Sequence, residues 1–325
     1  MQTEYMISIV VPVYNEMEVL SEFHARISGV LDQLSMGAEV IYVNDGSDDD
    51  SLSLLNEIYE QDARVAILDL SRNFGKEIAM TAGLHKAQGD AVIVIDADLQ
   101  DPPELIPQLI DEWQKGYDVI YAKRARREGE SAFKKLTAHL FYRLMRSIGQ
   151  IKIPEDTGDY RLLSRRAVDA LNTLSEQHRF MKGLFTWIGY RQKAVIYERD
   201  PRHAGESKWN YWHLWNFAIE GITSYSSAPL KLASYLGLLT ALGAFSYGIF
   251  IIIRTMLYGD PVQGYPSMIV IILFLGGVQL MSIGVLGEYV GRIFTETKRR
   301  PLYFINKFSL ARTTQKKNDA GQAAE

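Results

Sequence analysis

Cysteine is absent from this chain of 325 residues. Its absence excludes disulfides, thiolate metal sites and a cysteine nucleophile, and it leaves the redox compartment unreadable from cysteine usage. A large excess of charge is also lacking, because 35 Lys and Arg residues face 39 Asp and Glu residues and the formal net charge is −4. The composition therefore carries no global signal for nucleic-acid binding.

Two common nucleotide-binding motifs are missing as well. The apolar runs Ile7–Val13 and Ala38–Val43 are followed by Tyr14-Asn15-Glu16 and Asn44-Asp45-Gly46-Ser47. Neither segment contains the Gly-x-Gly-x-x-Gly of a dinucleotide fold or a P-loop lysine, which disfavours a nicotinamide enzyme and a P-loop ATPase. Polar groups at these strand ends could hold a nucleoside, with Asp45 accepting from the base or ribose. A simple strand-to-helix turn capped by Ser47 or Asp48 is the alternative.

Charge is absent from two long apolar stretches near the C-terminus, 232–253 and 268–286. About 20 apolar residues cross a bilayer as a helix, so the sequence predicts a membrane hairpin over 229–291, with spans at about 232–253 and 268–288. Buried helices of a soluble domain are the alternative. The basic residues follow the second span, which predicts cytoplasmic termini in a multi-pass protein of the inner membrane. Residues 292–325 then form a basic tail with a disordered end.

The chain before the hairpin, 1–228, alternates short apolar strands with helical patterns and reads as one cytoplasmic domain. An N-terminus without a basic region and apolar signal core agrees with that placement. The alternation predicts a doubly wound α/β sheet. The expected strands are Ile7–Val13, Ala38–Val43, Val65–Leu70, Ala91–Ile95 and Asp118–Ala122, and the expected helices are Glu18–Leu34, Ser51–Gln61, Lys76–Ala87 and Glu104–Lys115.

Acidic residues follow the Ala91–Ile95 run directly, in the order Asp96-Ala97-Asp98-Leu99-Gln100-Asp101. Carboxylates two residues apart at the end of a buried strand are the hard oxygen ligands that Mg²⁺ or Mn²⁺ prefers beside substrate phosphates. This pattern predicts an enzyme that acts on a nucleotide-activated substrate. An acidic turn that starts the helix at Glu104 is the alternative.

Basic and aromatic residues suggest contact with a membrane surface. Residues 131–147 alternate apolar with basic side chains, as an interfacial helix does, and tryptophans in 209–226 favour the headgroup region. An ordinary surface helix packed on the sheet is the alternative for the first segment. The Arg-rich segment 198–209 suits a loop that closes over phosphates, or else a solvated linker.

Five motifs occur in the order found in family 2 glycosyltransferases. They are Val11-Pro12-Val13-Tyr14-Asn15-Glu16, Val43-Asn44-Asp45-Gly46-Ser47, Ser71-Arg72-Asn73-Phe74-Gly75-Lys76, Asp96-Ala97-Asp98-Leu99-Gln100-Asp101-Pro102-Pro103-Glu104 and Asp156-Thr157-Gly158-Asp159-Tyr160-Arg161-Leu162. The chain resembles the polyprenyl-phosphate glycosyltransferases of that family, most closely the bactoprenol glucosyltransferases with two C-terminal membrane spans. Its catalytic domain is also similar to that of the dolichyl-phosphate mannose synthases. The resemblance implies a GT-A-type fold.

The resemblance also implies roles for individual residues. Those implied to bind the nucleotide are Pro12, Tyr14, Glu16, Val43, Asp45, Lys76, Asp96 and Ala97. Those implied to surround the diphosphate and its divalent cation, Mg²⁺ or Mn²⁺, are Asp96, Asp98 and Gln100. Arg124 and Arg202 correspond to positions that contact phosphate, and Asp159 to the acidic residue on the acceptor side. A helix-capping role is the alternative for Asp159.

The implied reaction is the inverting transfer of a hexose, most directly glucose from UDP-glucose, to undecaprenyl phosphate or a similar lipid. A lipid monophosphate arrives largely deprotonated, so Asp159 acts as a base or instead orients the acceptor and stabilises positive charge. GDP-mannose or another UDP-sugar as donor, and a noncatalytic membrane scaffold, are the competing readings. A homo-oligomer is plausible, because Gly287 and Gly291 permit close helix contact within the hairpin or between protomers. A separate flippase would then move the product.

Overall fold

The structure is a computed structural model that describes residues 5–124, 157–177, 179–197, 228–258 and 264–313. Its strands form one eight-stranded mixed sheet in the order β7-β5-β6-β4-β1-β2-β3-β8. The strands are β1 Met6–Val13, β2 Gly37–Asn44, β3 Val65–Leu70, β4 Ala91–Val94, β5 Val119–Arg124, β6 Thr157–Ser164, β7 Gln192–Tyr197 and β8 Ile305–Ser309. Strands β1 to β4 run parallel, whereas β6 is antiparallel to β4 and β5 and β8 is antiparallel to β3.

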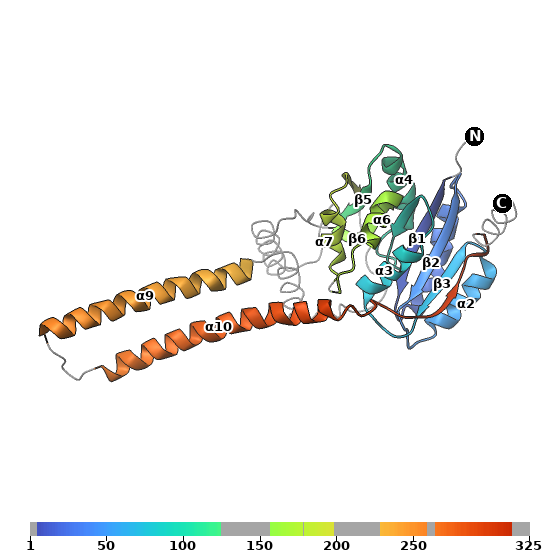
Figure 1. Cartoon of the computed structure of the whole chain (residues 1–325). Helices are drawn as coiled ribbons and strands as arrows, with labels where there is room; N and C mark the ends of the chain where they lie inside the picture. Colours follow the sequence, from blue (N-terminus) through green and yellow to red (C-terminus); the bar gives the residue numbers. More distant parts are fainter. Residues whose placement is uncertain (1–4, 125–156, 178, 198–227, 259–263, 314–325) are drawn as a thin grey trace.

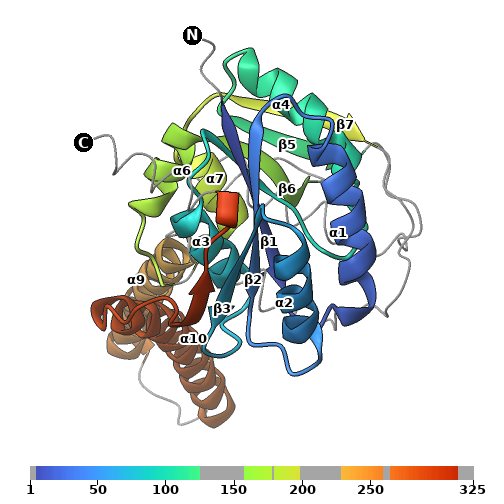
Figure 2. The same ribbon diagram turned by 90° about the vertical axis from the view of Figure 1, so that its right-hand side faces the viewer.

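Helices cover both faces of this sheet (Figure 2). Those of the domain are α1 Met17–Leu31, α2 Ser51–Gln61, α3 Lys76–Lys86, the 3₁₀ turn η1 Pro103–Leu105, α4 Ile106–Gln114, α6 Arg165–Asn172 and α7 Met181–Trp187. Helices α1, α2 and α4 pack into one buried cluster, and α3, α6 and α7 pack into the other. The predicted α/β class is therefore confirmed.

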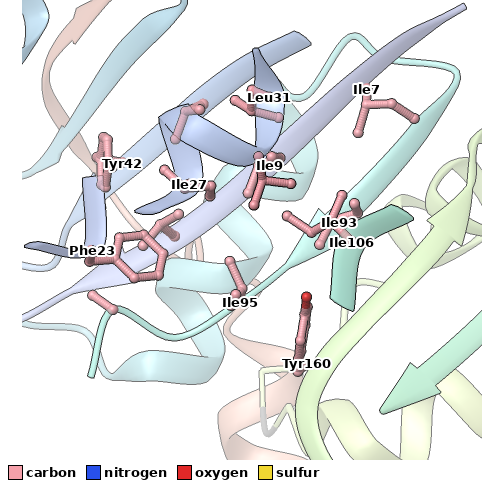
Figure 3. Close-up of a cluster of buried hydrophobic side chains, with 14 of the residues drawn as sticks. Ile7, Ile9, Phe23, Ile27, Leu31, Tyr42, Ile93, Ile95, Ile106 and Tyr160 are labelled. Carbon is pink, nitrogen blue, oxygen red and sulfur yellow. The ribbon is translucent and has the colours of Figure 1, made fainter. Parts of the chain in front are cut away.

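The apolar runs of the strands divide between these two clusters by simple alternation. In β1, Ile7, Ile9 and Val11 belong to the first cluster, while Val10 belongs to the second. Figure 3 shows Ile9 beside Ile27 of α1, in the same cluster as Ile7 and Phe23. Successive side chains of a strand point to opposite faces, so a strand covered on both sides is apolar along most of its length. This requirement explains why continuous apolar runs marked the central strands in the sequence.

The amino ends of the strands carry a buried polar cluster, which we call the amino edge. Glu39 Oε1 accepts from Ser8 Oγ at 2.5 Å and from the Gln88 amide at 2.9 Å, and Ser8 Oγ accepts from the Gly89 amide at 2.7 Å. Farther along the sheet, Asp118 accepts from Ser164 Oγ at 2.9 Å and from the guanidinium of Arg166. Since these groups satisfy one another, the amino edge holds the α3–β4 turn without a ligand.

Two long helices follow the domain, α9 Ala228–Tyr258 and α10 Tyr265–Thr297. They contact each other and project away from the sheet as an exposed pair (Figure 1). Within them, Leu232–Tyr258 and Ile271–Thr297 are long and apolar enough to cross a membrane. These segments overlap the predicted spans 232–253 and 268–288, and both helices run beyond the predicted ends, α9 to Tyr258 and α10 to Thr297.

Three strands were not expected from the sequence, namely β6, β7 and β8. Strand β6 carries Asp159 and Arg161, which break the apolar pattern used to recognise strands. Strand β8 lies in the segment read as a basic tail, and it pairs with β3 after the chain has returned from α10. The expected interfacial helices near 131–147 and 209–226 lie outside the described residues.

Candidate active site

The carboxyl ends of the parallel strands and the start of β6 meet at one edge of the sheet, which we call the carboxyl edge. In the ladder between β4 and β6, Val94 lies opposite Arg161. Because the pair is antiparallel, two steps beyond β4 bring Asp96 level with Asp159. The register therefore unites two acidic residues that are far apart in the sequence.

The loops after β1 and β2 are held together by hydrogen bonds. The Asn15 amide donates to Ser47 Oγ at 3.1 Å, and the Asp48 amide donates to Asn15 Oδ1 at 2.9 Å. Asn15 adopts a φ of +54°, which Asn tolerates better than most residues. Ser47 thus binds the neighbouring loop, whereas helix α2 begins only at Ser51 with Asp50 at its N-cap. The capping alternative for Ser47 and Asp48 is wrong.

Four residues predicted to bind the nucleotide surround these loops. Tyr14 is exposed, Pro12 and Glu16 are partly buried, and Val43 is fully buried in β2. An exposed aromatic ring beside a strand end is available to a flat ligand such as a base. Val43 belongs to the second hydrophobic cluster, so its side chain supports the sheet rather than facing solvent.

Asp45 fixes the loop between β3 and α3. Its two carboxylate oxygens accept from the backbone amides of Phe74 at 2.8 Å and Gly75 at 2.9 Å. Burial raises the pKa of Asp45, although these two hydrogen bonds and Arg72 oppose the shift. Gly46 adopts a φ of +64°, and a Cβ there would lie 2.4 Å from the carbonyl carbon of Arg72. Asp45 and Gly46 therefore bring the two loops into close contact.

Lys76, the first residue of α3, joins the two acids described above. Its Nζ lies 2.7 Å from Asp96 Oδ2 and 2.7 Å from Asp159 Oδ2. The Lys76 side chain is 43% exposed, whereas those of Asp96 and Asp159 are 25% and 12% exposed. The Lys76 side chain is therefore partly open to solvent, while its single positive charge is shared between two carboxylates that are more sheltered.

The protonation states within this trio follow from burial and charge. Burial would lower the pKa of Lys76, but Asp96 and Asp159 together raise that pKa above its usual value. Burial raises the pKa of Asp96 to about 6, with Lys76 opposing and Asp159 adding to the shift. For Asp159, burial is outweighed by Lys76, Lys182 and Arg161, which hold its pKa well below the usual range. Asp159 is therefore a carboxylate at neutral pH.

Arg161 supports the strand that presents Asp159. Its guanidinium donates to the carbonyl oxygens of Gly158 at 2.8 Å and Asp159 at 3.2 Å, and it lies 3.8 Å from the centre of the Phe185 ring. Burial lowers the pKa of Arg161 to about 10, so it still carries its charge at neutral pH. The sequence motif contained Arg161, but only the structure shows that its side chain holds the backbone carbonyls of Gly158 and Asp159.

The acidic turn after β4 contains a buried polar group whose hydrogen-bonding capacity the described residues do not satisfy. Leu99 adopts a φ of +59°, and the Gln100 amide donates to Asp98 Oδ1 at 3.1 Å. Gln100 is 4% exposed, yet its Nε2 has no hydrogen-bond partner among the described residues. Asp159 Oδ1 is likewise buried and unpaired within the described part of the chain. Buried polar atoms without partners are rare in proteins and mark places where another group binds.

The donor set also suits a divalent cation. Mg²⁺ is commonly held by one or two carboxylates, with water and substrate phosphates completing its shell. Asp96 and Asp98 offer such carboxylates, and Gln100 adds a buried amide. Among the described residues no three acidic or His side chains form a complete metal cage, so substrate oxygens would have to contribute.

Neither of the predicted phosphate-contacting arginines is described at the level of its side chain. Arg124 is the last residue of β5, at the carboxyl edge beside the end of β7, where it pairs with Tyr197. Arg202 lies outside the described residues. The helix-capping alternative for Asp159 is wrong, because Asp159 lies within β6 and Ser164 caps the helix that follows.

Comparisons with known proteins match both parts of the chain. The family model "Glycosyl transferase family 2" matches residues 8–171, and the model "GtrB C-terminal hairpin" matches residues 228–293. An uncharacterized glycosyltransferase of Synechocystis is 52% identical over 92% of this chain and 94% of its own length. The bactoprenol glucosyl transferase of Shigella phage SfII is 49% identical over 93% of this chain and 97% of its own length. The Escherichia coli prophage bactoprenol glucosyl transferase homolog is 47% identical over 93% and 98%.

Proposed function

The chain belongs to glycosyltransferase family 2, and we propose that it transfers glucose from UDP-glucose to a polyprenyl phosphate such as undecaprenyl phosphate. The products are polyprenyl-phosphate glucose and UDP, with inversion at the anomeric carbon. The observation that carries the proposal is the bridge from Lys76 to Asp96 and Asp159. This bridge joins an acid on the expected donor side to an acid on the expected acceptor side. The choice of glucose and of the lipid rests on the relatives named bactoprenol glucosyl transferase.

The donor nucleotide is proposed to bind at the ends of β1 and β2. Tyr14 and Pro12 would contact the base, and Glu16, Val43 and Asp45 would complete this part of the site. The exposed ring of Tyr14 supports a stacking role. Asp45 supports binding in a second way, because its hydrogen bonds to Phe74 and Gly75 hold the loop that leads to Lys76.

A divalent cation, Mg²⁺ or Mn²⁺, is proposed to be held by Asp96, Asp98 and Gln100, with Ala97 beside the nucleotide. Such a cation supplies positive charge beside the departing diphosphate. Lys76 adds a fixed positive charge at the same place. Because Lys76 is already held by Asp96 and Asp159, little reorganisation is needed when negative charge develops on the diphosphate.

Asp159 is proposed to orient the acceptor and to stabilise positive charge at the anomeric carbon. In the reaction a phosphate oxygen of the lipid bonds to the anomeric carbon, and the bond from that carbon to the β-phosphate oxygen breaks. The lipid phosphate is already largely deprotonated at pH 7, so this step needs no base. The lowered pKa of Asp159 supports the same role, since a weakly basic carboxylate is a poor proton acceptor.

The membrane arrangement is proposed from the two apolar helices α9 and α10. They would cross the inner membrane as a hairpin, with both termini and the catalytic domain on the cytoplasmic side. Lys298, Arg299 and Arg300 follow α10 directly, as the positive-inside rule requires for that orientation. Arg124 and Arg202 are proposed to contact phosphate. Homo-oligomerisation remains part of the proposal. A separate flippase is also proposed, since a two-helix hairpin alone is too small to conduct a sugar.

The test is transfer of radiolabelled sugar into a lipid extract by the purified full chain, with undecaprenyl phosphate, Mg²⁺ or Mn²⁺, and a panel of UDP- and GDP-sugars. We expect transfer from UDP-glucose, its loss on chelation, and a fall of at least about 100-fold in Asp98→Ala. Asp111→Ala, an exposed acidic residue on α4, is the matched control and should keep its activity.

Each other outcome changes the proposal in a defined way. Transfer from GDP-mannose or a different UDP-sugar would retain the reaction and replace the donor. Full activity in the presence of chelator would show that transfer needs no divalent cation. Absence of transfer across the whole panel by well-folded protein would favour the noncatalytic scaffold.

A further inference from the structure

The segment that follows the membrane hairpin is in contact with the framework of the donor site. We call residues 298–309 the C-terminal strap. They lie beyond the residues matched by either family model, which end at 171 and 293. Strand β8 forms the end of this strap and lies at the outer edge of the sheet, beside β3 (Figure 2).

A buried carboxylate connects the strap to the end of β2. Asp69, at 7% exposure, accepts from Asn306 Nδ2 at 2.7 Å through one oxygen and from Asn44 Nδ2 at 2.7 Å through the other. Asn44 Oδ1 in turn accepts from the Ser47 amide at 3.3 Å. This chain of hydrogen bonds runs from the strap to the loop that contains Asp45 and Gly46.

The register explains why Asn306 reaches Asp69. In the β3–β8 ladder, Lys307 lies opposite Asp69 and Ile305 lies opposite Leu70, with an irregularity between them. Asn306 is therefore the extra residue of a β-bulge, a device that redirects a side chain. Across the sheet, Asn44 lies opposite Asp69 in the next ladder. One row of residues thus connects β8, β3 and β2.

Two further contacts connect the strap to the elements that position Lys76. The Ser71 amide donates to the Phe304 carbonyl at 3.0 Å, at the start of the loop from β3 to α3. The hydroxyl of Tyr303 lies 2.9 Å from Nδ1 of His85, near the end of α3. The strap therefore contacts the β3–α3 loop and α3 itself, and Lys76 lies where they join.

The strap is also attached closely to the end of α10. The Gln177 amide donates to Glu296 Oε1 at 2.8 Å, and Gln177 Nε2 donates to the Arg300 carbonyl at 2.6 Å. Glu296 lies in the last turn of α10, only ten residues before Asn306. The donor-site framework and the membrane helix are consequently joined by a short, hydrogen-bonded segment.

We propose that Asn306 and Asp69 are positioning residues for the donor nucleotide, through which the strap after the membrane hairpin completes the donor site. They touch no substrate and act through Asn44 and the β2 loop. The inference rests on the proposed function in taking the nucleotide sugar as donor. It predicts that the domain before the hairpin has an incomplete donor site, even though it contains every residue implied to touch the nucleotide.

The test exchanges the two side chains in the full chain, purified in detergent. Asn306→Asp places two carboxylates in contact, and Asp69→Asn places an amide nitrogen against an amide nitrogen. In the double variant, the new amide at position 69 accepts from Asn44 and donates to the new carboxylate at position 306. Lys307→Ala, an exposed neighbour in β8, is the matched control.

We expect Asn306→Asp to raise the KM for the nucleotide sugar about tenfold, because it removes a bond to a buried group and adds charge repulsion. The KM for the lipid phosphate should stay within about twofold, and the double variant should restore the donor KM to within about twofold of wild type. Lys307→Ala should match wild type.

Several results would overturn the proposal. An unchanged donor KM in Asn306→Asp would do so, as would equal rises in both KM values or a donor KM that the double variant fails to restore. A fall in kcat with both KM values unchanged would indicate less folded enzyme and would also overturn it. The wild-type assay distinguishes failure of this inference from failure of the proposed function. If wild type uses a different nucleotide sugar, the same variants are compared with that donor.

Discussion

The Ser8–Glu39 cluster of the amino edge and the acidic residues of the carboxyl edge both bury polar groups, but the two sets differ in whether the described part of the chain supplies their hydrogen-bond partners. At the amino edge, Ser8, Glu39 and the Gln88–Gly89 backbone satisfy one another. At the carboxyl edge, Gln100 Nε2 and Asp159 Oδ1 are buried without partners among the described residues. A complete polar network stabilises a fold, whereas an incomplete one is retained where a ligand finishes it.

The backbone differs between the edges in the same direction. Among the described loops that flank β1 to β7, the non-glycine residues with a left-handed φ are Asn15 and Leu99, both at the carboxyl edge, whereas the turns that lead into the amino ends of β5 and β7 place Gly116 and Gly189 in this conformation. Such conformations cost free energy in non-glycine residues and persist where the surrounding structure requires them. The comparison therefore indicates that residues important for stability lie at the amino ends of the strands and residues important for function lie at the carboxyl ends. Substitutions at each edge can test this separation.

The largest expected effect is at the carboxyl edge, in Asp159→Asn. We expect the transfer rate per folded enzyme to fall by about 100- to 1,000-fold, because the charge beside the reacting carbon is lost. The fold should largely survive, since Lys76 keeps its ion pair with Asp96. The measurement is radiolabel transfer, with the folded fraction determined by size-exclusion chromatography. Transfer near the wild-type rate would exclude both the base and the electrostatic role for Asp159.

A stability effect is expected at the amino edge, in Glu39→Leu. The substitution leaves the Ser8 hydroxyl and the Gln88 amide without their acceptor at a site of 2% exposure, which costs about 1–3 kcal/mol of unfolding free energy. The Tm should fall by roughly 5 °C while transfer per folded enzyme stays at the wild-type level. Glu39→Gln keeps an acceptor oxygen and is the matched control. A large loss of transfer per folded enzyme in Glu39→Leu would break the comparison between the edges.

The smallest effect concerns pH and Asp118. Burial would raise the pKa of Asp118, but hydrogen bonds from Arg166 and Ser164 outweigh it and lower that pKa. A carboxylate with a lowered pKa adds stability that is fully present above its unfolded pKa of about 4 and is lost as pH falls through the folded value. We therefore expect Asp118→Asn to lower the Tm at pH 7 and the difference from wild type to shrink below about pH 4. A difference in Tm that does not change with pH would show that the substitution acts through packing and not through the charge of Asp118.

Much of the fold followed from the sequence for a simple physical reason. Strands β1 to β4 are buried on both faces, so each is predominantly apolar, and these strands alternate with amphipathic helices. The strands that were missed meet other requirements. Strand β6 contains Asp159 and Arg161, and β8 is a short strand at the outer edge of the sheet whose first three residues are exposed. The family match and this sheet together confirm the GT-A-type α/β class.

The candidate site was predicted only in part. The motifs located Asp45, Lys76, Asp96 and Asp159, yet the contacts among them depend on the β4–β6 register and on where α3 begins. The role of Asp45 in holding the β3–α3 loop was not foreseen, because Phe74 and Gly75 contribute backbone amides that leave no mark on a sequence pattern. The assigned roles of the site residues remain predictions for the experiments above.

The position of β8 along the chain sets an order for assembly during synthesis. The ribosome delivers β1 to β7 first, then both apolar helices, and β8 last, while N-terminal parts fold as they emerge. Until β8 arrives, β3 is an unpaired edge strand with open backbone groups, a surface that other nascent chains can join. Strand β8 can therefore pair with β3 only after α9 and α10 have been synthesised, so a chain that ends before Ile305 leaves β3 exposed at the edge of the sheet.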